Sequence, residues 1–304
     1  MQTFTGIDVG GSNVKFGLVD STGQLLEKQK VATKTLRASG SAGDGLVVAI
    51  GDWLRKYPQV QHVGIGLPGM LSADRRTLVE MVNIPELNNL DLVDRLEARH
   101  PNVAFHLEND ANAAALGEFY FSGRPMPDNF LLVTLGTGIG SGAVINRRIL
   151  TGGDGNALEL GHIVSGNGRS VEQTIGKAGL IQMTKDLLAA HSGHSALRHE
   201  AKLDDDAIID AANAGDPVAR RVLDEYGRVL GQALVSAIYL LDIKNIYIGG
   251  GVAKGFAHME KGVHESLNKF LTPYYLSKLN LNLAKLGNNA GILGAAALCF
   301  MPKG

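Results

Sequence analysis

Two carboxylates in this sequence stand where β-type runs end, and both are of a kind that takes part in phosphoryl transfer. Asp8 closes the run Phe4–Val9 and leads into a turn of two glycines and Ser12. The backbone N–H groups of such a turn can form an anion-binding nest. An acidic group beside a phosphate is expected when a cation such as Mg²⁺ lies between them. The alternative is a plain hairpin turn.

Asp110 lies in the segment Glu108-Asn-Asp-Ala-Asn112, which follows the expected strand Val103–Leu107 and opens an expected helix. A carboxylate at the carboxyl end of a strand can accept a hydroxyl proton as a phosphoryl group is transferred, which would make Asp110 a general base. Asp is also a favoured N-cap residue. Both interpretations stay open at this point.

Glu159 and His162 stand three residues apart in Glu-Leu-Gly-His. A carboxylate and an imidazole together offer the acceptors and donors that sugar hydroxyls need, although a surface turn is the alternative. Three further histidines in HSGHSALRH, residues 191–199, are interpreted as part of a solvated loop and not as a metal site.

The elements that would position these residues form two similar series. IDVGGSNVKFGLVDSTGQL and VTLGTGIGSGAVINRRIL each place a glycine-rich turn between the first two strands of a meander, which indicates an internal duplication. A nucleotide would lie in a cleft between the two resulting lobes, with its phosphates held by both turns. The other elements expected are the strands His62–Leu67 and Asn245–Ile248 and helices at Leu46–Tyr57, Glu172–Ala190, Asp204–Asn213, Asp216–Leu241 and from Asn289.

Two common nucleotide motifs are excluded. No GxxxxGK[ST] occurs, so the P-loop class does not apply. The turn at Gly136 is followed by the expected strand Ser141–Ile145, whereas a Rossmann fingerprint must open a helix.

Gly249–Gly251 follows a strand and suits a place where an adenine ring lies over the backbone. This interpretation is compatible with a helix start at the same residues.

Composition narrows the class of protein. The chain has 304 residues, 45% apolar and 19% charged, with a net charge of −1. That predicts about two globular domains and gives no indication of a nucleic-acid or membrane partner. The longest apolar runs, Ala233–Leu241 and Gly291–Met301, are shorter than the ~20 residues of a membrane span. The N-terminus does not resemble a signal peptide, and the single cysteine, Cys299, fits a cytoplasmic protein.

Six stretches in order resemble the ROK family (repressor, open reading frame, kinase) of sugar kinases and regulators, from Gly6 to Ala297. They are GIDVGGSNVKFGLVD, GIGLPG, ENDANAAALGE, TLGTGIGSGAVINRRILTGGDGNALELGHI, IYIGGGVA and AGILGAAAL. The resemblance implies an α/β, two-lobed actin-like or hexokinase-type fold (a ribonuclease H-like duplication). We expect a smaller lobe of residues 1–112 plus 289–304 and a larger lobe of residues 113–288.

The resemblance also implies roles for individual residues. Asp110 matches the catalytic base. The residues that match sugar-binding positions are Asn83, Asn109, Asp110, Glu159, His162 and Glu172. Those that match nucleotide-binding positions are Asp8, Gly10, Gly11, Ser12, Lys15, Thr137, Gly138, Gly250 and Gly251. The expected reaction is ATP-dependent phosphorylation of a hexose, with glucose as the first choice, Mg²⁺ bound with ATP near Asp8, and a homodimer.

The sequence departs from the family pattern at one place. The family usually has three cysteines after Glu-x-Gly-His that bind zinc with a histidine, whereas GHIVSGNGRSVEQ has none, so we expect no zinc. Zinc-free members that resemble polyphosphate-dependent glucokinases have a similarly short loop. The alternatives are therefore a polyphosphate donor and another hexose or an N-acetylhexosamine as acceptor. A sugar-binding regulator is disfavoured because no helix-turn-helix precedes the first strand, and an inactive sugar-binding protein because Asp110 is present.

Overall fold

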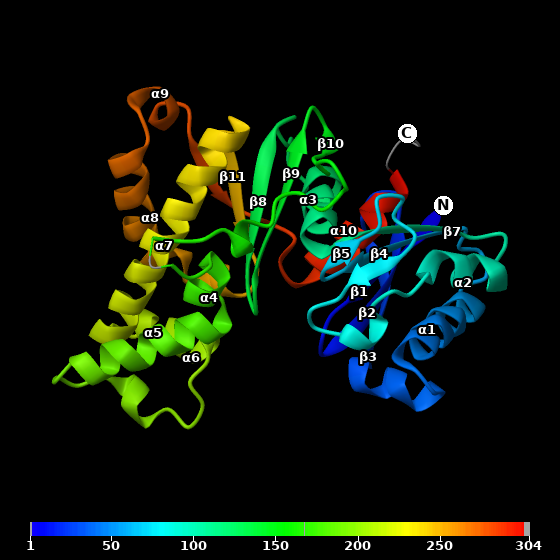
Figure 1. Ribbon diagram of the computed structural model, residues 1–304, viewed down its shortest axis with the longest axis horizontal. Coiled ribbons are helices and arrows are strands. Elements are labelled where there is room, and N and C mark those ends of the chain that lie inside the picture. The colour runs from blue at the N-terminus through cyan, green and yellow to red at the C-terminus, as the bar shows by residue number, and fades with distance from the viewer. Residues whose placement is uncertain (1, 167, 301–304) are drawn as a thin grey trace. The chain divides into compact units, whose positions relative to one another are not determined.

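The computed structural model describes residues 2–166 and 168–300, and contacts between Cα atoms group them into two compact units (Figure 1). The first unit contains the chain up to Asp128, the segment Gly142–Leu158 and the residues from Lys285 onward. The second contains Asn129–Ser141 and Glu159–Ala284. Each unit is therefore assembled from separate stretches of the chain.

The first sheet belongs to the first unit and has five strands in the order β3-β2-β1-β4-β7. Its strands are β1 (Thr3–Val9), β2 (Asn13–Asp20), β3 (Leu25–Ala32), β4 (His62–Leu67) and β7 (Ala104–Asn109). β1, β2 and β3 form an antiparallel meander, whereas β4 runs parallel to both β1 and β7. A separate two-stranded ribbon joins β5 (Met70–Leu71) to β6 (Leu78–Glu80).

The second sheet repeats this arrangement, in the order β10-β9-β8-β11-β12. Its strands are β8 (Phe130–Leu135), β9 (Ile139–Ile145), β10 (Arg148–Ile149), β11 (Asn245–Gly249) and β12 (Asn280–Leu283). β10 pairs antiparallel with β9, and β11 lies parallel to both β8 and β12. The shared order, with the third, second, first, fourth and fifth strands as neighbours, confirms the predicted duplication.

Most helices follow the expected pattern, but the helices over Phe256–Phe270 and Pro273–Leu276 were not expected and one expected helix is two. They are α1 (Ala42–Lys56), α2 (Leu92–Arg99), α3 (Asp110–Phe121), α4 (Val171–Ile175), α5 (Lys177–Ala190), α6 (Asp205–Asn213), α7 (Pro217–Leu241), α8 (Phe256–Phe270), α9 (Pro273–Leu276) and α10 (Ala290–Ala297). The single helix expected over Glu172–Ala190 is wrong, because Gly176 has ψ 173° and separates α4 from α5. Short 3₁₀ helices lie at Thr33–Ser39, Pro85–Leu87, Leu160–His162, Ala196–His199, Val252–Gly255, Gly287–Asn289 and Leu298–Phe300.

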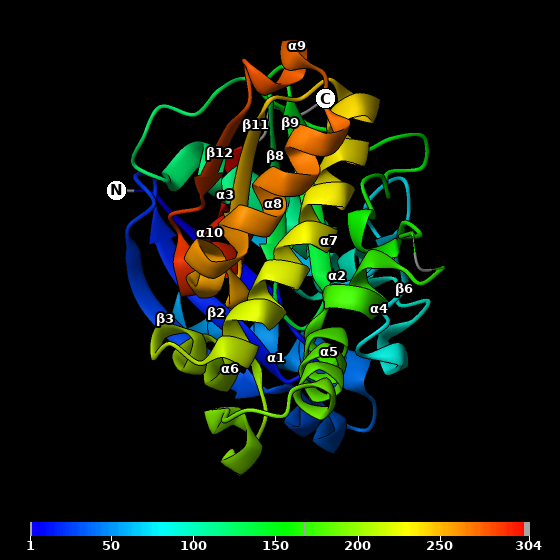
Figure 2. The ribbon, with the colours of Figure 1, turned by 90° about the vertical axis from the view of Figure 1, so that its left-hand side faces the viewer.

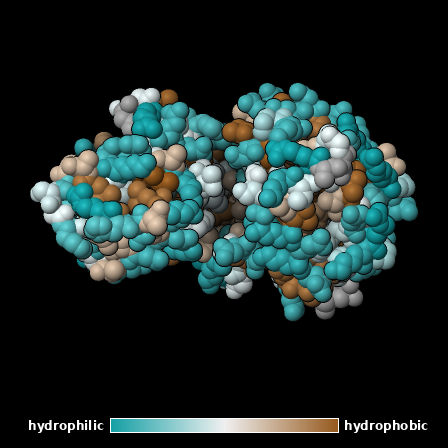
Figure 3. All heavy atoms as spheres, turned by 90° about the horizontal axis from the view of Figure 1, so that it is seen from below, coloured by the Kyte–Doolittle hydropathy of each residue, from teal (hydrophilic) through white to brown (hydrophobic). Residues whose placement is uncertain are grey.

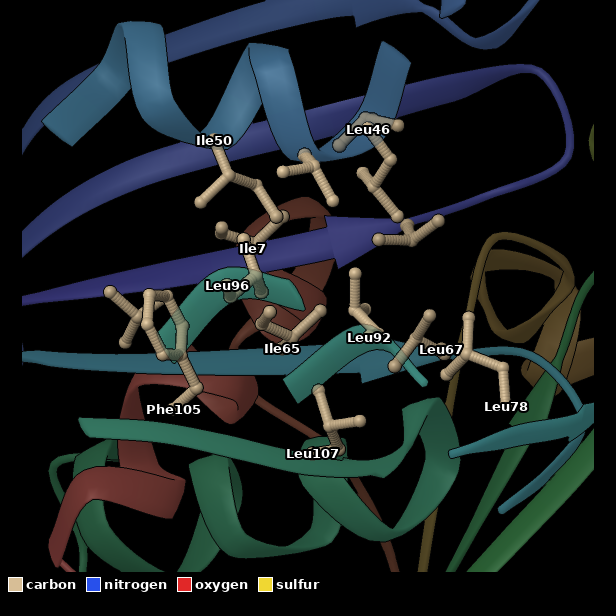
Figure 4. Packing of buried hydrophobic residues seen from close by; sticks show 14 of the residues in the cluster. Ile7, Leu46, Ile50, Ile65, Leu67, Leu78, Leu92, Leu96, Phe105 and Leu107 are labelled. Atoms are coloured by element: carbon tan, nitrogen blue, oxygen red, sulfur yellow. The ribbon is translucent and has the colours of Figure 1, made fainter. Parts of the chain in front are cut away.

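The core of the first unit lies between the first sheet and the helices α1 and α2. Figure 4 shows Ile7 and Ile65 from neighbouring strands pointing toward Leu46 and Ile50 of α1, and all four side chains are fully buried. Phe105 and Leu107 of β7 join the same cluster. Strands buried in this way fix the sheet, and with it the position of the residues that follow the strand ends.

The other face of the first sheet receives α10, and glycines in the strands make this approach possible. A Cβ atom at Gly64 would lie 1.8 Å from the carbonyl oxygen of Ala295, and one at Gly6 would lie 2.0 Å from that of Ile292. α10 also packs against α3, where a Cβ at Gly117 would lie 2.8 Å from the Cα of Gly294. All of α3 therefore lies in the first unit, whereas the lobe boundary expected after residue 112 falls within this helix.

α7 and α8 lie side by side in the second unit, as Figure 2 shows. Small residues bring them close, because a Cβ at Gly227 would lie 2.1 Å from the carbonyl oxygen of Met259, and one at Gly262 would lie 2.1 Å from that of Asp224. On the outer surface seen in Figure 3, hydrophilic residues prevail and apolar ones form separate patches. A search of the described residues finds no helix with the length and apolar character of a membrane span.

Candidate active site

Two of three neighbouring parallel strands in the first unit, β1 and β7, end with the residues expected to carry the chemistry. Asp8 of β1 pairs in register with Gly66 of β4, and Gly66 pairs with Glu108 of β7. Asn109 is the last residue of β7 and Asp110 the first of α3. Because the carboxyl ends of parallel strands meet at one edge of a sheet, this edge is where α/β proteins bind their ligands.

Asp8 lies between a lysine and the start of a helix. Its Oδ2 atom is 2.7 Å from Nζ of Lys15, the residue opposite it on β2. A Cβ at Gly291, in the first turn of α10, would lie 2.5 Å from Cγ of Asp8, so only glycine leaves room for this carboxylate. Mg²⁺ in phosphoryl-transfer sites is held by one or two carboxylates together with substrate phosphates. A partly exposed Asp8 next to a glycine turn fits that donor set.

The first glycine turn brings a predicted phosphate-binding residue next to a predicted sugar-binding residue. The N–H of Gly10 donates to the carbonyl of Asn13, and the Thr33 hydroxyl donates to the carbonyl of Gly10 over 2.7 Å. Gly11 and Asn83 are both exposed, and a Cβ at Gly11 would lie 3.1 Å from the Cβ of Asn83. Gly11 and Asn83 are therefore neighbours.

Asn109, and not Asp110, caps α3. The Oδ1 atom of Asn109 accepts hydrogen bonds from the N–H groups of Ala111 and Asn112, at 2.9 and 3.3 Å. Its Nδ2 atom faces the carbonyl of Gly69 at 3.4 Å. The alternative that Asp110 merely caps the helix is therefore wrong. Asp110 is half-buried at the first position of the helix, where its charge is also favoured by the helix dipole.

A buried carboxylate next to these residues was missed by the sequence reasoning. Glu108 is 3% exposed, and its Oε2 atom lies 3.2 Å from Nε of Arg75. Its Oε1 atom accepts hydrogen bonds from the N–H of Asn109 and from Nδ2 of Asn112. Glu108 stood in the motif that identified Asp110, but nothing in a single sequence indicates that Arg75 is its partner.

The second glycine turn, in the second unit, is joined to Glu172. The N–H of Ile139 donates to Oε2 of Glu172 over 2.9 Å, and a Cβ at Gly138 would lie 2.2 Å from the same oxygen. The carbonyl of Thr137 accepts from the N–H of Lys177, at the start of α5. α4, which carries Glu172, begins with a capping box formed by Ser170 and its third helical residue. Glu172 thus contacts the predicted phosphate turn.

Glu159 and His162 lie at the two ends of a single tight turn. Oε2 of Glu159 is 3.8 Å from Nε2 of His162, and the N–H of Leu160 donates to the Ser141 hydroxyl in β9. Burial raises the pKa of Glu159, His162 opposes this shift, and the negative charge of Glu172 adds to it. The two glutamates therefore influence each other electrostatically. With the exposed imidazole they form a polar group suited to hydroxyl recognition.

Gly250 and Gly251 follow β11 and lie against the end of β8. Gly250 has φ +89°, and a Cβ there would lie 2.2 Å from the carbonyl oxygen of Leu135, which precedes the second glycine turn. Nothing lies within 4 Å of a Cβ built at Gly251. The structure therefore places the predicted adenosine segment next to the predicted phosphate turn, both of them in the second unit.

The remaining candidates are the histidines of residues 191–199 and Cys299. No group of three or more His, Cys, Asp or Glu side chains suited to a metal ion occurs in the part of the chain that the structure describes. His199 ends a 3₁₀ helix, and His191 and His194 lie in the connection that precedes it. Cys299 is a free thiol whose pKa is raised by burial.

Comparison with known proteins gives a family match over almost the whole chain. The model of the ROK family matches residues 4–301. A glucokinase of Thermotoga maritima is 30% identical over 310 residues, which cover 96% of this chain and 96% of that protein. A β-glucoside kinase of Klebsiella pneumoniae is 28% identical over 294 residues, covering 95% of this chain and 93% of that protein.

Solved structures agree with this match. A candidate sugar kinase from Cytophaga hutchinsonii superposes with a TM-score of 0.93 at 36% identity, covering 98% of this chain and all of that one. A ROK family glucokinase from Streptomyces griseus, solved in complex with glucose and AMPPNP, has a TM-score of 0.80 at 30% identity, covering 98% and 99% of the two chains. These similarities confirm the predicted α/β fold of the hexokinase type.

Proposed function

The chain belongs to the ROK family and is a sugar kinase, and from this premise we propose that it transfers the terminal phosphoryl group of ATP to the 6-hydroxyl of glucose. The observation that carries the proposal is the position of Asp110. It lies half-buried at the carboxyl edge of the first sheet, the same edge at which Asp8 lies. Asn109, and not Asp110, is the N-cap of α3.

Asp110 acts as the general base. A carboxylate needs only to come within hydrogen-bond distance of the primary hydroxyl to accept its proton as the phosphorus is attacked. Asn83 and Asn109 of the first unit bind sugar hydroxyls. Asn109 offers them its Nδ2 group, because its Oδ1 atom is engaged by the N–H groups of α3.

Further polar groups are proposed for the sugar, and two glycine segments for the nucleotide. Glu159, His162 and Glu172 accept from and donate to hydroxyls, and a site built in this way rejects analogues that lack them. Thr137 and Gly138 bind phosphate oxygens through their backbone, whereas Gly250 and Gly251 leave the space that an adenosine needs. Gly10, Gly11 and Ser12, with Lys15, bind the phosphates from the first unit.

The residues around Asp8 fit a magnesium ion that arrives with the nucleotide. When bound, Mg²⁺ would neutralise phosphate charge during transfer, and Asp8 is the residue that would hold it. Lys15, whose Nζ lies 2.7 Å from Asp8, would then contact a phosphate oxygen. We expect activity to require added Mg²⁺ and the protein to act as a homodimer.

The test is an ADP-release assay with glucose, mannose, allose, fructose, β-glucosides and N-acetylated hexosamines, repeated with polyphosphate as donor. We expect glucose with ATP to give the highest kcat/KM. Asp110→Asn should lower kcat by ~10² or more with little change in sugar binding. If no sugar is phosphorylated with either donor, the kinase assignment is refuted. A clear preference for another acceptor or for polyphosphate would refute only the assignment of glucose or ATP.

A further inference from the structure

We propose that Arg75 is a positioning residue for the transfer reaction, which holds the base segment through Glu108 and the segment before Glu159 through Gly155. This inference rests on the proposed kinase function. Arg75 lies in the turn between β5 and β6, and its guanidinium contacts Glu108 and the carbonyl of Gly155. Its effect is transmitted by two contacts within the first unit.

The first contact is a buried ion pair. Oε2 of Glu108 lies 3.2 Å from Nε of Arg75, with side-chain exposures of 4% and 18%. A carboxylate that is removed from water needs a partner charge or it becomes protonated. Arg75 therefore supplies the partner charge for this buried carboxylate.

The other oxygen of Glu108 fixes the start of α3. Its Oε1 atom accepts from the N–H of Asn109 over 2.8 Å and from Nδ2 of Asn112 over 3.1 Å. These bonds orient the peptide between Glu108 and Asn109. Asp110 follows one residue later, so its position depends on the same peptide. A displaced Glu108 would lose one or both of these bonds, and the base would shift with the peptide.

The second contact holds the segment that leads to Glu159. Nη2 of Arg75 donates to the carbonyl of Gly155. Gly155 has φ +89°, and a Cβ there would lie 2.6 Å from Nη1 of Arg75, so the guanidinium fits only against glycine. The side-chain amide of the next residue, Asn156, makes two hydrogen bonds of 3.0 Å to Leu71 in β5. Its Oδ1 accepts from the N–H of Leu71, and its Nδ2 donates to the carbonyl of Leu71. Glu159 follows three residues later.

The backbone of Arg75 is itself held in an unusual conformation. Its φ is +59°, in the left-handed region that residues with a Cβ rarely occupy. Its N–H donates to the carbonyl of Ser72 over 2.9 Å, and Ser72 bonds in turn to Thr77. A non-glycine residue keeps such a conformation when its surroundings determine it, which often marks a functional segment.

Arg76 provides a matched control in the same turn. Its guanidinium also contacts two carboxylates, those of Asp94 and Glu97, but its side chain is 40% exposed. Exposed pairs of this kind contribute little. Arg76→Met therefore removes the same type of side chain from the same turn without disturbing Glu108.

The experiment compares Arg75→Met, Arg75→Lys and Arg76→Met in the full chain. We expect Arg75→Met to lower kcat/KM for glucose by ~10², the loss that a small misplacement of reacting groups produces. Lysine keeps a cation opposite Glu108 but cannot also bridge to Gly155. Arg75→Lys should therefore regain most of kcat while KM for glucose stays raised. Arg76→Met should stay within about twofold of wild type in both parameters.

Hydrogen exchange provides a readout that does not depend on catalysis. We expect peptides spanning residues 109–113 and 153–158 to exchange at least ~10-fold faster in Arg75→Met and at the wild-type rate in Arg76→Met. If the methionine variant fails to fold, Arg75→Lys carries both measurements. If the wild-type protein shows no sugar-dependent ADP release, the proposed kinase function is refuted. The exchange measurement would then still decide whether Arg75 holds the two segments. The inference is overturned if Arg75→Met equals Arg76→Met in kinetics or in exchange.

Discussion

The contact between Gly138 and Glu172 allows a single methyl group to be used as a probe of the second glycine turn. In Gly138→Ala the new Cβ would lie 2.2 Å from Oε2 of Glu172, whereas ordinary contacts begin at 3.4 Å. The carboxylate or the turn must therefore move by 3.4 − 2.2 = 1.2 Å. A shift of that size breaks the 2.9 Å bond from the N–H of Ile139.

The expected cost follows from that bond. A hydrogen bond to a charged group contributes about 1.5–3 kcal/mol, which corresponds to a factor of roughly 10 to 150 in an equilibrium constant. We therefore expect kcat/KM for glucose and for ATP to fall by about this factor, since the turn and Glu172 are assigned to the two substrates. Gly153→Ala is the control, because nothing lies within 4 Å of a Cβ at that exposed position.

Repeating the Gly138→Ala substitution in a Glu172→Ala variant shows whether the loss comes from the contact with Glu172 or from a general defect of the turn. Glu172→Ala removes the carboxylate, so adding Gly138→Ala to it should cost less than about threefold more. Initial rates over a grid of glucose and ATP concentrations give both constants for all four proteins. An equal loss in the presence and absence of the carboxylate would refute the reasoning, and so would a Gly138→Ala protein with wild-type constants.

Three further predictions concern stability and pH. Gly64→Ala should lower the free energy of unfolding by ~2 kcal/mol or more, because its Cβ would meet the Ala295 carbonyl at 1.8 Å; a urea titration that shows a loss below 0.5 kcal/mol would contradict this. Glu118→Ala should cost ~2 kcal/mol and Glu118→Gln less, because buried Oε1 of Glu118 accepts from the N–H groups of Lys285 and Leu286, at 2.8 and 2.7 Å. Since the pKa of Glu159 is raised in the folded protein, wild-type stability should fall as the pH rises from the ordinary carboxyl pKa to the raised one. Glu159→Gln should lack that fall, and urea midpoints measured across this pH range compare the two proteins.

The strands that carry the site could be predicted because they are buried on both faces. β4 was placed to the residue, since a continuous apolar run is typical of a central parallel strand. β12 was missed, because Asn280–Leu283 is an edge strand with mostly exposed side chains and no buried pattern. The break at Gly176 was also missed, because one glycine within a helical pattern does not by itself indicate an end.

The candidate site residues were predicted with a rule that joins sequence to topology, namely that polar residues after buried strands gather at one sheet edge. That rule indicated Asp8 and Asp110 as candidates, and Asn109 was added by resemblance. The rule could not decide which of Asn109 and Asp110 caps the helix, because this depends on side-chain rotamers. It also missed Arg75, whose pairing with Glu108 joins two segments that are brought together only by the ribbon β5–β6.

The glycine-lined face that receives α10 has a consequence for synthesis on the ribosome. Domains generally fold as units while the chain emerges, with the earlier part first. Here β1, β2 and β4 emerge early, but the helix that covers Gly6, Gly17 and Gly64 comes from residues 290–297, after the whole second unit has been translated. The part of the protein made first is therefore completed last. A ribosome stalled before residue 290 would present an uncovered sheet that chaperones or the α10 segment of another nascent chain can bind.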